Sequence, residues 1–422
     1  MTGPLKVAVI GGGSTYTPEL VDGLGRLAGR LDVAEVALCD PDEARLAVVG
    51  PLAQRILTRL GSRITVTCHT SLEPAIDDAG AVLLQLRVGG QRTRHRDETW
   101  PLECGCIGQE TVGAGGLAKA LRTVPVALGI ADRARELAAD DAWIIDFTNP
   151  VGIVTRALLD AGHRTVGLCN VAIGFQRECA GLLGVDPHEV SIDHVGLNHL
   201  TWERAAYVDG VDRLPRLIEE HGAELAEGMC APESIVRRTG AVPSYYLQFY
   251  YDHDELVREQ RGAPTRAEKV AQVEADLLRL YADPALDHKP AELEQRGGAF
   301  YSEAAVGLLT SLVVGDGATH VANVRNRGAL PFLPDEAVIE VPSTIGRDGA
   351  HALPVQPLPP LARSLVAHVS AYEELAVQAA LHGGRDRVES ALLAHPTVGQ
   401  YDLAERLTDS LLAENAEFLS WA

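Results

Sequence analysis

The amino-acid sequence predicts an α/β fold, with an N-terminal Rossmann-like, doubly wound sheet and a C-terminal α+β domain. Two observations predict the N-terminal part. Short apolar runs alternate with helical segments, and a glycine-rich turn joins the first run to the first helix. The α+β domain is predicted by strand patterns that look antiparallel after Asn149 and by long helices in the remainder.

The N-terminal elements are expected in strand–helix order. Strands are expected at Lys6–Ile10, Val33–Cys39, Arg63–Thr67, Ala81–Arg87 and Ala142–Asp146, and helices at Pro18–Ala28, Glu43–Leu60 and Leu117–Ala138. Pro51 follows Gly50 inside the second helix, where a proline can kink or split it. This order produces βαβ units and a parallel sheet with helices on both faces.

The second half of the chain has a different pattern. Further strands are expected at Thr165–Leu168 and within His194–Val208 and Gly315–Asn326, and helices at Thr265–Ala282, Pro359–His382 and Leu403–Leu419. We predict one domain over residues 1–165 and a second over residues 166–422, packed on the carboxyl edge of the sheet. The proline-rich stretch Leu353–Pro360 is expected to be a loop.

Composition excludes several classes of function. The chain has 422 residues and a net charge of -21, which argues against a nucleic-acid or anionic-membrane surface. Its seven cysteines are an odd number, which fits a reducing cytoplasm better than a disulfide framework. The N-terminus does not have the pattern of a secretory signal, and no apolar run reaches the length of a membrane span.

The glycine turn predicts a dinucleotide site. A strand ends at Ile10, Gly11 to Gly13 follow, and a helix begins near Pro18, so free N–H groups would face a pyrophosphate. We predict that the cofactor contacts Gly11, Gly13, Ser14, Thr15 and Asp40. Asp40 ends the second strand, where an acid accepts a hydrogen bond from a ribose hydroxyl of NAD. Tyr16 replaces the third glycine of the usual motif, so a plain connecting turn is the alternative.

Two further patterns are ambiguous by themselves. Cys169 follows a strand and His199 lies between two strand-like runs, which suits either a divalent metal or a buried thiol and a core histidine. The segment PSYYLQFYY (243–251) holds a concentration of tyrosines. It can be an aromatic stripe on a packed helix, or it can contain a tyrosine that acts as a base.

Several motifs together resemble glycoside hydrolase family 4, in its 6-phospho-β-glucosidase branch. They are VAVIGGGSTYTPEL, IGQETVGAGGLAKALRTVPV (107–126), DFTNPVG (146–152), GLCN (167–170), DHVGLNHLTW (193–202), PTRAEKV (264–270), RGGAFYSEAA (296–305) and EVPSTIGRDGAHAL (340–353). They stand in order over nearly the whole chain. The family's NAD-dependent route is an exception to two-carboxylate glycoside hydrolysis.

The resemblance implies an oxidation–elimination reaction on a phosphorylated β-glucoside. NAD⁺ removes hydride from C3 of the sugar, a base takes the C2 proton, and the aglycone leaves by elimination. Water then adds and the hydride returns, so the cofactor is not consumed. A divalent metal, usually Mn²⁺, holds the C2 and C3 oxygens. A homodimer or homotetramer in the cytoplasm is also implied.

The resemblance also assigns residues. Cys169 and His199 become the metal ligands, Tyr246 the base, and Glu110 the carboxylate that tunes the tyrosine and metal region. The implied substrate contacts are Arg94, Asn149, Asn170 and Arg266. Guanidinium groups suit a phosphate dianion. Arg266 can instead be a surface charge at a helix start, and Asn149 a turn residue before Pro150.

Asn170 bears on the anomeric specificity. Members specific for α-linkages usually have an aspartate after the metal cysteine, and asparagine cannot donate a proton as an acid, so the resemblance points to the β branch. It leaves the acid for the leaving group unassigned. Two rival functions remain at this point, a dehydrogenase of the malate/lactate type, which shares the fold, and a silent sensor of NAD or sugar phosphate.

Overall fold

The computed structural model describes residues 4–27, 29–297 and 300–421. Its N-terminal strands are β1 (Leu5–Ile10), β2 (Val33–Cys39), β3 (Thr65–His69), β4 (Ala81–Leu84), β5 (Trp143–Asp146) and β6 (Thr165–Gly167). All neighbouring pairs among them are parallel, in the order β6-β5-β4-β1-β2-β3. The predicted doubly wound sheet is therefore confirmed. Only β2 has its predicted bounds: β1, β5 and β6 differ by one residue at one end, β3 is shifted by two residues towards the C-terminus, and β4 ends at Leu84 rather than Arg87.

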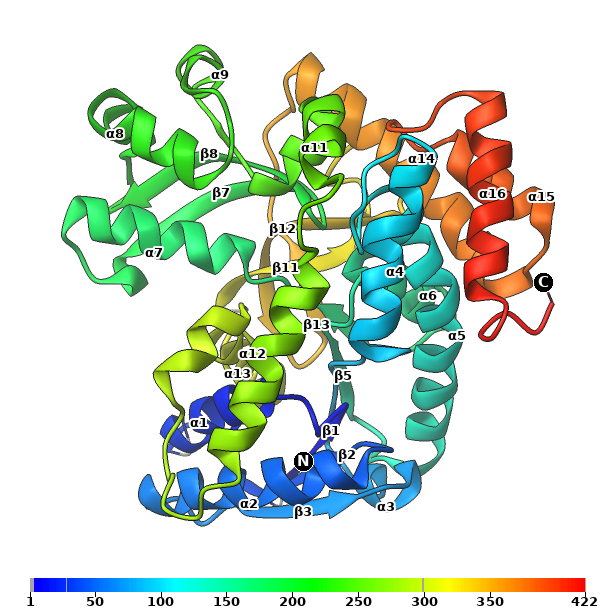
Figure 1. Cartoon of the computed structure of the whole chain (residues 1–422). Coiled ribbons are helices and arrows are strands. Elements are labelled where there is room, and N and C mark those ends of the chain that lie inside the picture. Colours follow the sequence, from blue (N-terminus) through cyan, green and yellow to red (C-terminus); the bar gives the residue numbers. More distant parts are fainter. Residues whose placement is uncertain (1–3, 28, 298–299, 422) are drawn as a thin grey trace.

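The later strands are antiparallel and extend the same sheet. They are β7 (Val190–Leu197), β8 (Leu200–Val208), β9 (Val211–Asp212), β10 (Val242–Pro243), β11 (Thr319–Arg325), β12 (Val338–Gly346) and β13 (Gly349–Ala352). The order continues from β6 through β11, β12, β7 and β8 to β10. The join is antiparallel, with Asn323 of β11 opposite Gly167 of β6. Figure 1 shows the parallel strands β1 to β3 at the bottom and the β7–β8 hairpin at the upper left.

The helices are α1 (Thr17–Arg26), α2 (Glu43–Arg59), α3 (Leu72–Ile76), α4 (Gly90–Glu103), α5 (Gly113–Leu137), α6 (Val151–Asp160), α7 (Val171–Leu183), α8 (Leu214–Gly228), α9 (Glu233–Thr239), α10 (Gln248–Tyr251), α11 (His253–Gln260), α12 (Arg266–Tyr281), α13 (Tyr301–Val314), α14 (Pro360–His382), α15 (Arg385–Leu393) and α16 (Tyr401–Asn415). Short 3₁₀ helices cover Pro187–Glu189, Tyr245–Leu247 and Ala291–Arg296. Pro51 lies inside α2 without splitting it. The helix predicted to reach Ala28 ends at Arg26, and Ala28 itself lies outside the described residues.

Two hydrophobic cores hold the molecule together. The larger core joins the sheet to its helices. The smaller one lies under α7, α8 and the outer part of the β7–β8 hairpin, and it includes Phe175, Leu217 and Val236. Burial of these apolar side chains is the main favourable term in folding.

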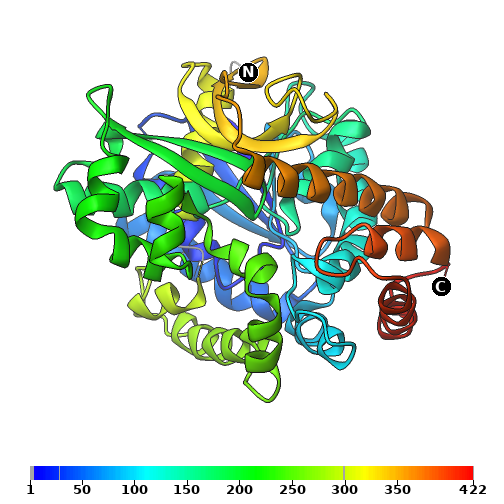
Figure 2. The same ribbon diagram turned by 90° about the horizontal axis from the view of Figure 1, so that it is seen from above.

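The C-terminal helices return to the N-terminal half. α14 and α16 both pack on α5, and α16 also contacts α4 (Figure 2). On another side, α12 packs against α2 and α4. These contacts bring late segments of the chain beside the carboxyl edge of the parallel sheet, where open α/β sheets bind ligands. Over the described residues, no helix is both long and apolar enough to cross a bilayer.

Candidate active site

The glycine turn lies tightly against the end of β2. The N–H groups of Gly11 and Gly12 both donate to the carbonyl of Cys39, at 2.8 and 2.9 Å. A Cβ on Gly12 would lie 2.8 Å from the Cα of Leu38, so the turn has no room for a side chain there. The Gly13 N–H donates to Oδ2 of Asp40 at 3.0 Å. The turn and the predicted ribose acid thus form one unit, whose geometry fits a dinucleotide site.

Helix α12 closes over this turn from outside the N-terminal region. The hydroxyl of Tyr281 donates to the carbonyl of Thr15 at 2.7 Å, and Glu274 Oε1 lies 3.5 Å from Thr15 Oγ1. Ser14 Oγ accepts from the N–H of Tyr16 at 3.2 Å. Tyr16, which stands at the position of the third glycine in the usual motif, packs its ring edge-on against Tyr301 of α13. The cofactor contacts of Gly11, Gly13, Ser14, Thr15 and Asp40 all stay predictions.

The two predicted metal ligands are joined through Asn198. Cys169 directly follows Leu168 after β6, and His199 is the second residue of the two-residue turn between β7 and β8. His199 has a φ of 62°, an uncommon left-handed conformation for a histidine. The side chain of Asn198 forms hydrogen bonds with the Cys169 thiol and with Glu340 Oε2. Both predicted ligands are buried.

Neighbouring side chains fix the tautomer of His199. Thr111 Oγ1 lies 3.0 Å from His199 Nδ1 and 2.8 Å from Gln109 Oε1. An amide oxygen can only accept, so the Thr111 hydroxyl donates to Gln109 and accepts from Nδ1–H. Nε2 then carries the lone pair that a metal needs. Burial lowers the pKa of His199 to about 4, which keeps the ring neutral.

The donor set fits a divalent metal that also binds substrate. Within the described residues, no group of three or more His, Cys, Asp or Glu side chains could hold a metal ion. A thiolate and an imidazole alone leave coordination positions open for substrate oxygens. In the protein by itself, burial raises the pKa of Cys169 well above its ordinary value. A bound cation reverses that effect, because a coordinating thiol is deprotonated.

Glu110 is surrounded by cations. Its Oε2 accepts from Lys119 Nζ at 2.5 Å and pairs closely with Arg87, while its Oε1 lies 3.2 Å from Arg94 Nη2. Burial by itself would raise the pKa of this carboxyl, but Arg87, Lys119 and Arg94 outweigh it and hold the pKa well below its ordinary value. Glu110 is therefore a fixed negative charge beside the predicted base.

Tyr246 lies directly on His199. The two rings stack with centroids 3.6 Å apart and an interplanar angle of 8°, and the Tyr245 ring lies 4.2 Å from that of Tyr246. Burial, followed by Tyr245 and Cys169 and then by Glu110, raises the pKa of Tyr246 well above its ordinary value. A phenolate formed here is a strong base, and the positive charge of Arg94 and of a bound metal favours its formation.

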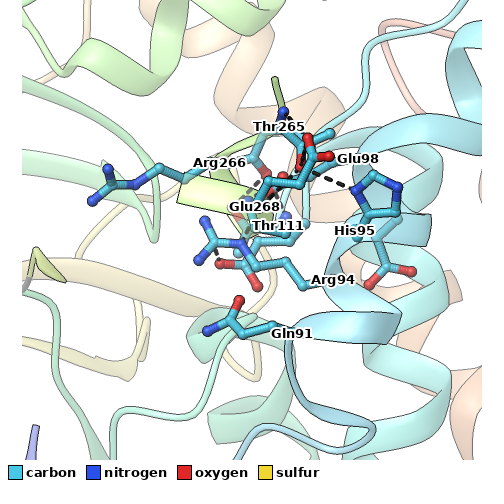
Figure 3. Close-up of polar contacts among 12 residues, drawn as sticks. Gln91, Arg94, His95, Glu98, Thr111, Thr265, Arg266 and Glu268 are labelled. Atoms are coloured by element: carbon cyan, nitrogen blue, oxygen red, sulfur yellow. Dashed lines mark hydrogen bonds and ion pairs between the residues drawn. The ribbon is translucent and has the colours of Figure 1, made fainter. Parts of the chain in front are cut away.

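The predicted substrate residues come from four separate elements. Arg94 lies on α4, Arg266 begins α12, Asn149 precedes α6 and Asn170 caps α7. Asn149 Oδ1 is buried and has no hydrogen-bond partner among the described residues, which suits a ligand hydroxyl. Arg266 is exposed, and its Nη2 reaches the carbonyls of residues 295 and 296 at 3.3 and 3.4 Å. Figure 3 shows Arg94 and Arg266 in the same region.

An open cleft lies beside Cys169, which is the one predicted site residue among the described residues of its lining. Its volume is about 780 Å³, and it runs between α1, α7 and α13 to Leu168 and Cys169.

Sequence reasoning missed Thr111, Lys119 and the partnership of Arg87 with Glu110. It also missed α4 as a helix. The charged stretch QRTRHRDE (91–98) has no apolar periodicity, so the usual signal for a helix is absent there.

Comparison with known proteins identifies the family of this chain. The model of the Family 4 glycosyl hydrolase matches residues 6–185, and that of the Family 4 glycosyl hydrolase C-terminal domain matches residues 194–398. A 6-phospho-beta-glucosidase of Escherichia coli is 34% identical, over 99% of this chain and 97% of its own length. That of Thermotoga maritima is 32% identical, over 98% and 99%.

Solved structures are also similar to this chain over nearly its whole length. The Thermotoga maritima 6-phospho-beta glucosidase solved with manganese, NAD⁺ and glucose-6-phosphate superposes with a TM-score of 0.92. It is 33% identical and covers 98% of this chain and 99% of its own. A malate dehydrogenase of Cryptosporidium parvum, 15% identical with a TM-score of 0.55, shares the fold alone and covers 90% and 99%. The chain belongs to family 4 of the glycosyl hydrolases.

Proposed function

We propose that this protein hydrolyses 6-phospho-β-glucosides with NAD⁺ and a divalent metal such as Mn²⁺. The single observation that carries the proposal is the stack of Tyr246 on His199, with Glu110 and Arg94 beside it. A dehydrogenase of the malate/lactate type does not need a tyrosine stacked on a metal-ligand histidine. The relatives above 30% identity described above are 6-phospho-β-glucosidases, which supports the same substrate class.

When bound, NAD⁺ supplies a reversible hydride acceptor and the metal supplies a Lewis acid for neighbouring sugar oxygens. Cys169 and His199 hold the metal, with the His199 tautomer fixed by Thr111. Tyr246 takes the proton from C2, and Glu110 raises the basicity of its phenolate. The buried amide oxygen of Asn149 accepts a hydrogen bond from a sugar hydroxyl.

The sugar phosphate is recognised by Arg94 and Arg266. Arg94 is mostly buried, with 11% of its side chain exposed, and Arg266 is exposed, so Arg94 can contact the phosphate from inside the site and Arg266 from the solvent side. Asn170 cannot act as an acid for an α-linked leaving group, which favours β-glucosides.

Gly11, Gly13, Ser14, Thr15 and Asp40 contact the dinucleotide, as the sequence predicted. A cytoplasmic homodimer or homotetramer completes the proposal.

The test is an assay of an aryl 6-phospho-β-glucoside with NAD⁺ and Mn²⁺ in D₂O. Release of the phenol, deuterium at C2 of the product sugar and no net NADH are expected. Net NADH formed from a hydroxy acid, without phenol release, would support the dehydrogenase instead. Binding of NAD⁺ without any turnover of phosphorylated or unphosphorylated glucosides would support the sensor.

A further inference from the structure

Glu98 connects three parts of the candidate site. It lies on α4, its side chain is 8% exposed, and both of its carboxylate oxygens are used. Oε1 accepts from Nε of Arg94 at 2.7 Å, one turn earlier on the same helix. Oε2 accepts from the backbone N–H of Ala267 at 2.8 Å. Figure 3 shows this carboxylate between Arg94 and the start of α12.

The contact with Arg94 fixes the direction of its guanidinium. Arg94 Nε is held by Glu98, and Nη2 lies 3.2 Å from Glu110. A planar guanidinium that is held at two of its nitrogens keeps a single orientation. Because the Arg94 side chain is only 11% exposed, loss of either carboxylate would leave a buried N–H donor without its partner.

The contact with α12 fixes the position of Arg266. Ala267 follows Arg266 directly in the first turn of the helix, where backbone N–H groups have no partner inside the helix. A carboxylate there also interacts favourably with the helix dipole. His95, on the same helix as Glu98, lies within 3.1 Å of Thr265 Oγ1 through its Nδ1 and adds a second contact to this end of α12.

The backbone of Glu98 also abuts the loop that carries Glu110. A Cβ on Gly108 would lie 1.9 Å from the carbonyl oxygen of Glu98. This approach is possible only for glycine, so α4 and the loop 107–112 are set at a fixed separation. Glu98 therefore touches the elements that bear Arg94, Arg266 and Glu110 at the same time.

We propose that Glu98 is a positioning residue that holds Arg94 and Arg266 in one geometry for the sugar phosphate. This inference rests on the phosphate role proposed above for the two arginines. A residue that only tied α4 to α12 would change stability and leave substrate selection unaltered. A positioning residue changes the KM for phosphorylated substrate, and it does so more than kcat.

The test is Glu98→Gln in the full-length protein, loaded with NAD⁺ and Mn²⁺. Glutamine has one acceptor oxygen and one donor NH₂, so either Arg94 Nε–H or the Ala267 N–H must face a donor. We expect KM for an aryl 6-phospho-β-glucoside to rise about tenfold or more, and kcat to fall by a smaller factor, because Arg94 also favours the Tyr246 phenolate. Inhibition by inorganic phosphate should weaken in parallel, and NAD⁺ affinity should stay the same.

Glu268→Gln is the matched control. Glu268 lies one residue after Ala267 and accepts from the N–H of Thr265 at 2.8 Å, but it contacts neither substrate arginine in the described residues. Glutamine can still accept from the Thr265 N–H in the capping box, so this variant removes only the favourable interaction of the negative charge with the dipole at the same helix start. We expect a loss of thermal stability with KM within about twofold of the parent value.

Arg94→Met and Arg266→Met distinguish failure of the positioning role of Glu98 from failure of the phosphate role of the two arginines. If they raise KM while Glu98→Gln leaves it unchanged, Glu98 has no positioning role. If neither arginine variant raises KM, the phosphate role of the arginines is wrong and the inference falls with it. Should Glu98→Gln not fold, Glu98→Asp keeps the charge but is too short to reach both donors. An unchanged KM in that variant would also overturn the proposal.

Discussion

Tyr246 and His199 form a parallel ring stack with centroids 3.6 Å apart, although they are 47 positions apart in the chain. The pairing of β10 with β8 brings them together, with Pro243 opposite Trp202, and the N–H of Ser244 donates to the carbonyl of Thr201 at 2.9 Å. Ser244 then caps the 3₁₀ helix that carries both tyrosines. The predicted base and a predicted metal ligand are thus positioned by the same hairpin.

Tyr246→Phe is expected to abolish the exchange of the C2 proton with solvent. Loss of a general base costs typically about 100-fold or more in rate. The measurement is deuterium incorporation at C2 of the sugar phosphate, followed by mass spectrometry. Tyr245→Phe, on the neighbouring ring, serves as control and should retain exchange within about tenfold. If Tyr245→Phe is the damaging change, the assignment of the base is shifted by one residue.

Cys169→Ser should weaken Mn²⁺ binding and leave NAD⁺ binding intact. The thiol lies after β6, far along the chain from the glycine turn that is predicted to bind the dinucleotide. Mn²⁺ affinity can be measured by electron paramagnetic resonance, and NAD⁺ affinity by calorimetry. Full activity of this variant without added metal would show that Cys169 is not a ligand.

Thr111→Val should reduce Mn²⁺ affinity by about 10- to 100-fold, as loss of an outer-shell partner typically does. Valine keeps the shape of threonine but cannot accept the Nδ1–H hydrogen bond, so His199 can take the wrong tautomer. Thr111→Ser keeps the hydroxyl and should bind Mn²⁺ with nearly the parent affinity. Equal affinities for the Val and Ser variants would contradict the proposed role of the hydroxyl.

Gly12→Ala should impair NAD⁺ binding. Its new methyl would meet the backbone of β2 rather than a flexible side chain, so the turn must move away from Leu38. Gly129→Ala in α5 is the control, since a Cβ there meets no atom within 4 Å. Alanine in a helix is favoured over glycine, so this control should keep or raise the melting temperature. NAD⁺ titration of both variants gives the comparison.

We expect the folded state to lose stability in acid because of the buried side chain of His395. Burial lowers the pKa of His395 to about 3, and its Nε2 accepts from the N–H of Gly113 at 3.1 Å. The unfolded chain takes up this proton near its ordinary pKa of about 6.5, while the folded chain does not. Stability is therefore lost as pH falls from 6.5 towards 3, approaching ~1.4 kcal/mol per pH unit for this group.

His395→Gln removes this contribution, and the glutamine oxygen can still accept from Gly113. Urea unfolding between pH 7 and 5 should show a shallower pH dependence for the variant than for the parent protein. Parallel curves for the two proteins would mean that His395 does not contribute to acid sensitivity.

Much of the fold follows from local patterns. The strand Val33–Cys39 was predicted with its observed bounds, because it is apolar except for Glu35 and ends in the fully buried run Val36–Cys39, which is typical of a strand covered on both faces. The α14 helix was also predicted close to its observed position, and the antiparallel strands expected within His194–Val208 are β7 and β8, although β7 begins earlier, at Val190. The division into domains at residue 165 stays a prediction.

The sequence by itself determined the parallel α/β half, the glycine turn with Asp40, and the motifs of the family. These are local features, in which residues close in the chain form one element. Only the tertiary structure decided which distant groups meet: Thr111 with His199, Lys119 with Glu110, and Glu98 with Ala267. Such pairs depend on how whole helices pack around the sheet, and that packing is decided by burial summed over many side chains rather than by any local pattern.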